Sequence, residues 1–458
     1  MLYTYYGDDF TGSTDVLETL ALAGVPAVLF LAPPSPADLA QFPTAQAIGI
    51  AGDSRSRTPQ WMTANLPAIF ETLKPFGAPI VHYKTCSTFD SAPHIGSIGR
   101  AMELGIASFH PRFVPIVVAA PHLGRYVLFG NLFASAGDDV YRIDQHPTMS
   151  RHPVTPMLEP DLRKHLAKQT NLPIALLDIR NITPALSSQT LSSELLTNPA
   201  AILFDGLDEA SLEATGNLLW QEATNSGTPH SRATSAGVAH SSQSHRDEWG
   251  TSEARTLFCI GSSGLTESLI PTWRAANLIP AKPDAPTPAD PQNQILILSG
   301  SCSPVTQSQI EHALANGFHG IPIDPTSLIH DPTNTLTQTL ETLTAGKSPI
   351  LYTALGPLSS ATQPHAAELG EALGKLLRHI MQQRHIRRIV LCGGDTSSHA
   401  IQQLPITALT WLAPLSPGAP LCRAHSTNPA FHQTEFVLKG GQVGPANFFE
   451  LALSGGTR

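Results

Sequence analysis

The chain has 458 residues and a formal net charge of −9, from 27 lysines and arginines against 36 aspartates and glutamates. This negative balance argues against nucleic-acid binding, which depends on clustered cations. No run of about 18 apolar residues occurs, and the N-terminus lacks a basic segment, so we expect no membrane span and no signal peptide. The five cysteines form no CxxC pair and fit a reducing compartment. We therefore expect a cytoplasmic protein.

The first half of the chain alternates short apolar runs with helix-like segments. The runs lie at 2–6, 25–31, 45–51, 79–83, 115–120, 172–179, 200–204 and 256–260. Strands that alternate with helices predict a parallel sheet covered by helices on both faces. The same rhythm resumes at 295–298, 349–353 and 388–391. The predicted class is therefore α/β, with two α/β domains of mainly parallel sheets and a ligand cleft between them.

Two compositional breaks interrupt this rhythm. Residues 224–253 consist mostly of Ser, Thr, His, Gly and Ala, which predicts a solvated insertion. Residues 278–293 hold five prolines and are typical of a semi-rigid linker. We accordingly predict an N-terminal domain over 1–277 and a C-terminal domain over 294–458.

The first candidate site follows the first apolar run. Asp8 and Asp9 precede Thr11 and Gly12 at the start of a predicted helix. Two adjacent carboxylates at the end of a strand could bind a polyol or act as a base toward a hydroxyl. Alternatively, Asp9 or Thr11 only caps the helix and Asp8 is solvated. The doubled aspartate favours function, since one cap needs only one carboxylate.

The second candidate follows the run at 79–83, where a lysine, hydroxyls and a carboxylate cluster. Its candidate substrate-binding residues are Lys84, Ser87, Thr88 and Asp90. Such a set suits a small hydroxylated acid, although a polar turn between strand and helix is an equal alternative.

The third candidate is a loop rich in cations and stiffened by prolines, with His146, Arg151 and His152 as candidate ligand-binding residues. An arginine there could grip a carboxylate or a phosphate in a forked contact. The alternative is a solvated loop whose arginines pair with nearby acids. The spacing is not that of a metal site.

The fourth candidate is a set of glycine- and serine-rich turns in the second half. Glycines between a strand and a helix let backbone N–H groups approach phosphates. The candidate nucleotide-binding residues are Ser299, Gly393, Gly394, Asp395, Thr396 and Gly441.

Taken together, these motifs resemble the four-carbon acid sugar kinase family. The matching elements, in order, are the D-D-x-T-G turn at 8–12, the turn at 84–88, S-G-S-C-S at 299–303, G-G-D-T-S at 393–397 and L-K-G-G-Q-V-G at 438–444. The resemblance covers nearly the whole chain apart from 224–253. It implies a kinase that uses ATP to phosphorylate a hydroxyl of a four- or five-carbon acid sugar.

The resemblance also implies roles for the motifs. Asp8 and Asp9 would face the sugar, one of them orienting or deprotonating the attacked hydroxyl, and the turns of the second half would hold ATP. Phosphoryl transfer of this kind uses Mg²⁺; no residue is assigned to it.

The second motif departs from the family pattern D-S-T-x-R-G, because Cys86, Asp90 and Ser91 replace the aspartate, the arginine and the glycine. We expect another cation, with Arg151 as the candidate, to hold the substrate carboxylate. The C-S-T-F-D form at 86–90 resembles the branch of the family that handles oxo acids, and this resemblance implies that an oxo acid such as 3-oxo-isoapionate is a reasonable substrate.

Two other classes of function compete with this one. A non-kinase enzyme, such as an isomerase or hydrolase, could use the same cleft for a sugar acid. A ligand-binding protein without activity is a second alternative, although the intact motifs speak against it. The sequence leaves the oligomeric state open, and a homodimer is one option.

Overall fold

The structure of the chain is a computed structural model, and it describes residues 1–152, 154–183, 191, 195–224, 256–356 and 366–456. Apart from Thr224, the predicted insertion at 224–253 lies outside these described residues. None of the described helices is long and apolar enough to cross a membrane.

The N-terminal half contributes eight strands to the main sheet, and all of them pair in parallel with one another. They are β1 (Tyr3–Gly7), β2 (Ala27–Phe30), β3 (Ala47–Ala51), β4 (Ile80–Lys84), β5 (Val114–Val117), β9 (Ile174–Leu177), β10 (Ala201–Phe204) and β11 (Leu257–Gly261). Every residue of β1 and β4 is buried, as expected for strands that helices cover on both faces. These strands fall within one or two residues of the predicted runs, except that β5 ends three residues before the run at 115–120 does.

The C-terminal half contributes seven strands to the same sheet. They are β12 (Leu296–Ser299), β13 (His319–Pro322), β14 (Pro349–Tyr352), β15 (Arg388–Cys392), β16 (Ala408–Ser416), β17 (Ala419–His425) and β18 (Glu435–Lys439). The α/β class with a mainly parallel sheet is confirmed.

The sequence did not predict how the two halves join. β16 pairs in antiparallel with β2 through Ala408 opposite Phe30 and Leu409 opposite Leu29, so one sheet of order β13-β14-β12-β15-β18-β17-β16-β2-β3-β1-β4-β11-β5-β10-β9 runs through the molecule. One cluster of buried apolar side chains likewise extends through both halves.

The antiparallel pairs reverse the strand direction between the halves. Six strand-to-strand steps separate β1 from β15. At the usual twist of about 20–25° per step, they add up to roughly 120–150°. This rotation offsets most of the reversal, so the carboxyl ends of β1 and β15 turn toward the same side of the molecule.

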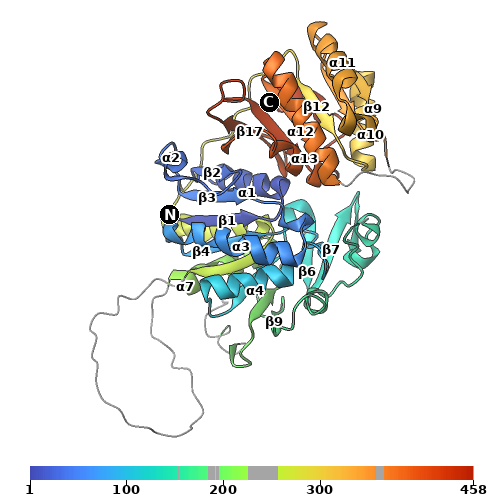
Figure 1. Cartoon of the computed structure of the whole chain (residues 1–458). Helices are drawn as coiled ribbons and strands as arrows, with labels where there is room; N and C mark the ends of the chain where they lie inside the picture. Colours follow the sequence, from blue (N-terminus) through green and yellow to red (C-terminus); the bar gives the residue numbers. More distant parts are fainter. Residues whose placement is uncertain (153, 184–190, 192–194, 225–255, 357–365, 457–458) are drawn as a thin grey trace.

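The helices complete the layers. They are α1 (Phe10–Leu22), α2 (Pro36–Leu39), α3 (Pro59–Leu73), α4 (Ile98–Phe109), α5 (Leu162–Leu166), α7 (Glu209–Thr224), α8 (Ser263–Ala275), α9 (Pro304–Ala315), α10 (Pro325–His330), α11 (Thr333–Thr344), α12 (Ala366–Gln383), α13 (Gly394–Ile401) and α14 (Phe448–Ser454). Helices α3 and α4 pack together in front of the N-terminal strands, while α1 lies between the two halves and contacts α8, α13 and β17 (Figure 1). Helix α1, near the start of the chain, therefore packs directly against the C-terminal half.

A second, antiparallel sheet consists of β6 (Arg125–Leu128), β7 (Asn131–Ala136) and β8 (Asp139–Arg142). Figure 1 shows β6 and β7 to one side of the N-terminal strands of the main sheet. The proline-rich residues 278–293 form no helix or strand, and the Asp290 carbonyl accepts a hydrogen bond from Arg388. The domain boundary placed there remains a prediction.

Candidate active site

The parallel register of three central strands builds the N-terminal part of the site. Gly7 at the end of β1 lies opposite Ala51 of β3 and Lys84 of β4. The segments that follow these strands therefore emerge at the same edge of the sheet, which is where open α/β sheets bind ligands. Asp8 and Asp9, Arg55 and Lys84 all lie in or beside these segments.

Asp9 begins helix α1. Its Oδ1 accepts a hydrogen bond from the Gly12 backbone N–H at 2.9 Å, and its Oδ2 accepts one from the Thr11 hydroxyl at 2.5 Å. This is the geometry of an N-cap, which satisfies amide groups that have no acceptor inside the helix. The capping alternative is thus correct for Asp9, but Asp8 is buried rather than solvated.

Arg55, in a short 3₁₀ turn after β3 (Ser54–Ser56), spans both carboxylates. Its Nε and Nη2 donate to Asp8 at 3.3 and 2.6 Å, and its Nη1 and Nη2 donate to Asp9 at 2.9 and 3.0 Å. The Arg55 side chain is only 18% exposed, and those of Asp8 and Asp9 are 5% and 4% exposed. Buried charges need such compensation by partners of opposite sign.

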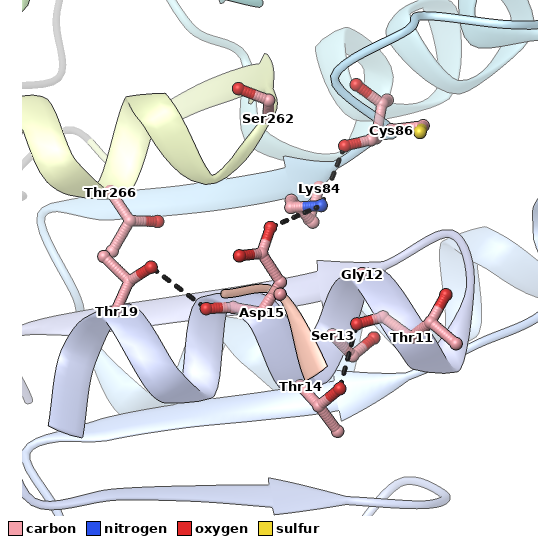
Figure 2. A network of polar contacts seen from close by, with 12 residues as sticks. Thr11, Gly12, Ser13, Thr14, Asp15, Thr19, Lys84, Cys86, Ser262 and Thr266 are labelled. Carbon is pink, nitrogen blue, oxygen red and sulfur yellow. Dashed lines mark hydrogen bonds and ion pairs between the residues drawn. The ribbon is translucent and has the colours of Figure 1, made fainter. Parts of the chain in front are cut away.

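Lys84 lies over the first turn of α1. Its ammonium group lies 3.6 Å from the Asp15 carboxylate, and Figure 2 shows these two groups pointing toward each other. The ammonium group also donates to the Thr85 backbone carbonyl at 2.9 Å. Gly12 makes this approach feasible, because a Cβ there would lie 2.5 Å from Asp9 Oδ1 and 2.9 Å from Lys84 Nζ. The glycine of the first motif therefore serves close packing between the first and second motifs.

Part of the third candidate joins the second. Asp90 Oδ1 accepts from the Thr88 hydroxyl at 2.6 Å, and Asp90 Oδ2 accepts from the Thr155 hydroxyl at 3.2 Å. His152 Nδ1 in turn lies 3.0 Å from the Thr155 hydroxyl and accepts from the Thr155 backbone N–H at 3.1 Å. Thr88, Asp90 and His152 therefore belong to one buried or half-buried network.

Three other candidates are not brought into this network by any described contact. His146 uses its Nδ1 to accept from the backbone N–H groups of Thr148 and Met149, which stabilises its own loop. Arg151 is exposed, and Ser87 is half-buried at the edge of the second motif. Arg151 is thus poorly placed to replace the missing arginine.

The candidate nucleotide turns also meet at one edge of the sheet. Ser299 of β12 pairs with Cys392 of β15, and Cys392 pairs with Lys439 of β18. Gly441, beyond β18, accepts a hydrogen bond from Thr306 through its carbonyl, and a Cβ added to it would lie 3.0 Å from the Ser301 hydroxyl. The turns after β12, β15 and β18 therefore pack against one another.

Helix α13 begins inside this cluster without a side-chain cap. Gly393 occupies the cap position with φ of 110°, a conformation that favours glycine, and among the described residues no side-chain hydrogen bond caps the first amide groups. A Cβ added to Gly394 would lie 3.8 Å from Asp9 Oδ2, and the Phe10 backbone N–H donates to the Ser398 hydroxyl at 3.3 Å. The start of α13 thus faces the start of α1.

Burial and charge shift the titration of this site. Burial raises the pKa of Asp8 to about 6, although Arg55 pulls it down. Burial also raises the pKa of Asp395, again against the effect of Arg55. The pKa of Asp90 is lowered: burial opposes ionisation, but Arg55 and His152 outweigh it. Carboxyl groups with shifted pKa values in one place are typical of catalytic sites.

The sequence analysis did not select Arg55. It lies in G-D-S-R-S-R, directly after the run at 45–51, so the end of that strand was a usable signal. Among the turns of the N-terminal half, only those after the first and fourth runs were predicted to bind a ligand, and the cation was sought at Arg151 instead.

Comparisons with known proteins agree with this arrangement. Residues 3–242 match the model of a sugar-binding N-terminal domain, and residues 296–449 match that of a nucleotide-binding C-terminal domain. The chain is 40% identical to a 3-oxo-isoapionate kinase of Paraburkholderia graminis, over 99% of this chain and 94% of that protein. It is 27% identical to a 3-oxo-tetronate kinase of Cupriavidus necator, over 97% and 95% of the two chains.

Solved structures share the fold. A protein of Salmonella typhimurium LT2 described as a putative tRNA synthase aligns with a TM-score of 0.71 and 23% identity, over 99% of this chain and 98% of that one. A Haemophilus influenzae protein aligns with a TM-score of 0.64 and 23% identity, over 98% of each chain.

Proposed function

The chain belongs to the four-carbon acid sugar kinase family, and from this premise we propose that it transfers the γ-phosphoryl group of ATP to a hydroxyl of a small oxo acid sugar of the 3-oxo-isoapionate type. The name of the relative at 40% identity supports this substrate class over the tetronates named for the relatives at 24–27%. The non-kinase alternative has no comparable support.

One observation carries the proposal: the paired carboxylates at the start of α1 face the uncapped start of α13. Phosphoryl transfer depends mainly on positioning and on neutralising charge. The free amide groups at the start of α13 suit the γ-phosphate. Across from them, Asp9 Oδ2 lies 3.8 Å from the Cβ position of Gly394, so the carboxylate pair lies on the side from which the acceptor hydroxyl would approach.

The other predicted residues divide between the two substrates. We assign Lys84 to the anionic end of the acid sugar, because its ammonium group is held at the same sheet edge as the carboxylate pair. We assign the network of Thr88, Asp90 and His152 to the hydroxyl and oxo groups of the sugar. Ser299, Gly393, Thr396 and Gly441 are assigned to the nucleotide.

Charge supports a requirement for Mg²⁺. Around the site the structure gathers the carboxylates of Asp8, Asp9, Asp15, Asp90 and Asp395 and the cations of Arg55 and Lys84. Two anionic substrates add to this excess of negative charge. Among the described residues no group of three or more potential ligands forms a metal site. Mg²⁺ usually takes one or two carboxylates plus substrate phosphates, and Asp395 in the phosphate turn fits that role. When bound, the ion would neutralise charge on the transferred phosphoryl group.

The test is an ADP-release assay across a panel of acid sugars. The panel holds 3-oxo-isoapionate, 3-oxo-tetronates and their reduced forms, each with and without Mg²⁺. We expect release that depends on the acid sugar and on Mg²⁺, with the highest kcat/KM for 3-oxo-isoapionate. A phosphorylated product of matching mass excludes an ATPase side reaction.

Two outcomes would contradict the proposal. Conversion of a sugar acid without ADP release would favour an isomerase or a hydrolase. Calorimetric binding of ATP with no turnover on any member of the panel would favour a ligand-binding protein.

A further inference from the structure

We propose that Arg55 is a positioning residue for phosphoryl transfer. It fills the remaining acceptor sites of Asp9, which leaves Asp9 a structural role. It also holds Asp8 in place as the carboxylate that receives the proton of the acceptor hydroxyl. This inference rests on the proposed kinase function and adds a division of labour between the two adjacent aspartates.

Asp9 has no acceptor capacity left for a substrate. An ionised carboxylate offers about four lone-pair sites. Oδ1 of Asp9 receives the Gly12 N–H and one Arg55 N–H, and Oδ2 receives the Thr11 hydroxyl and another Arg55 N–H. All four sites are therefore used inside the protein.

Asp8 is bound on one side only. Arg55 donates once to each of its oxygens, at 2.6 and 3.3 Å, and within the described residues no other group donates to this carboxylate. About two lone-pair sites thus remain for an incoming hydroxyl. Arg55 has little hydrogen-bonding capacity left for a substrate, because four of its five N–H groups donate to the two aspartates.

The charged groups around Asp8 lie at the ends of the three strands β1, β3 and β4, which meet at this edge of the sheet. Arg55 after β3 and Lys84 of β4 favour its ionised form, whereas burial and Asp9 disfavour it. Tyr6 and Tyr83 are the other titratable neighbours, and burial keeps both neutral by raising their pKa values far above 10. The pKa of about 6 for Asp8 leaves it largely ionised at pH 7 and basic enough to take up a proton.

The acceptor hydroxyl gives its proton to a lone pair of Asp8 that Arg55 leaves unoccupied, while its oxygen forms a bond to the γ-phosphorus. The bond from that phosphorus to the β,γ-bridging oxygen breaks, and ADP leaves with the electron pair. Asp8 later releases its proton to solvent.

The experiment is the pH profile of kcat/KM for the full chain and three variants, because this profile reports groups of the free enzyme. For the native protein we expect activity to fall as the pH drops through about 6, where Asp8 becomes protonated. Arg55→Gln removes the nearest cation, so the midpoint of the acid limb should move upward by about one pH unit or more. Arg55→Lys, which keeps the charge but not the fork, should lower kcat with a smaller shift.

Arg57→Gln is the matched control. Arg57 lies two residues away and pairs with Asp53, with its Nε 3.1 Å from the Asp53 carboxylate. It should leave the profile unchanged. In an Asp8→Asn background, Arg55→Gln should cause little further loss, because the two residues act as a unit.

An acid limb that stays in place in both Arg55 variants, or a full additional loss in the Asp8→Asn background, would overturn the role of Arg55. Native protein that releases no ADP with any acid sugar would instead overturn the proposed function. Calorimetric ATP binding and the far-ultraviolet circular dichroism spectrum check that each variant is folded.

Discussion

The starts of α1 and α13 face each other and differ in how their first backbone amide groups are satisfied. Each follows a buried parallel strand and exposes amide groups that have no acceptor within the helix. Asp9 caps α1 with its own carboxylate, whereas Gly393 has no side chain to cap α13, and no other side chain in the described part of the chain does so. The first start is therefore closed and negatively charged, and the second is open and suited to an anion.

This difference teaches how one interface can serve two substrates. In the proposed reaction, side chains at the start of α1 would orient and deprotonate the acceptor hydroxyl. Backbone amide groups at the start of α13 would hold the phosphate, where the absence of a capping side chain removes steric hindrance. A substitution at one of the two helix starts should therefore weaken binding of the substrate on that side more than binding of the other substrate.

The largest effect is expected from Gly393→Ala. Its φ of 110° is strained for any residue with a Cβ, at about 1–3 kcal/mol, and the turn must rearrange. We expect ATP affinity to fall by roughly 10- to 100-fold in calorimetry, with little change in acid-sugar binding. Gly317→Ala is the control, because Gly317 has φ of 93° and open space around it. Equal losses of ATP affinity in both variants would refute a local role of the turn.

An intermediate effect is expected from Gly12→Ala on the other side. The added methyl group would press on Asp9 Oδ1 and displace Lys84 Nζ from the first turn of α1. We expect KM for the acid sugar to rise about tenfold, the size of one lost charge-assisted contact, while KM for ATP stays constant. If KM for ATP rose instead, Lys84 would belong to the nucleotide side.

The smallest effect is expected from removal of the cap itself. Asp9→Ala should lower the free energy of unfolding by about 1–2 kcal/mol in urea titrations, because it removes the cap and one partner of Arg55. Asp9→Asn retains a capping oxygen and should lose less. Thr58→Ala removes the comparable cap of α3, away from the site, and should cost stability without affecting turnover. A larger loss in Asp9→Asn than in Asp9→Ala would contradict the role of Asp9 as a cap.

The sequence predicted the eight N-terminal strands of the main sheet and three of its seven C-terminal strands, because strands buried on both faces read as apolar runs. The sequence did not predict β13, β18 or the small sheet of β6, β7 and β8. It did not predict the hairpin of β16 and β17, although Pro417-Gly418 is a turn signal between two strand-like segments. The pairing of β16 with β2 could not be predicted from the sequence, because it consists of two residue pairs from distant parts of the chain.

The site was predictable where its residues share one turn. Asp8 and Asp9, or Gly393 and Gly394, are adjacent in the sequence. Arg55 was missed because it pairs with residues 46 and 47 positions away, and spacing says nothing about such contacts. Arg151 was preferred for its charge-rich loop, but local charge does not reveal that a side chain points into solvent.

The pairing of β2 with β16 has a consequence for solubility. Each half alone would end in an unpaired strand edge at this position, and β2 (A-V-L-F) is entirely apolar. Such an edge is a template for pairing with other chains. Because each edge covers the other, β13 and β9 are the outer strands of the large sheet in the part of the chain that the structure describes. β13 ends in Pro322, which lacks the N–H that a growing aggregate would need.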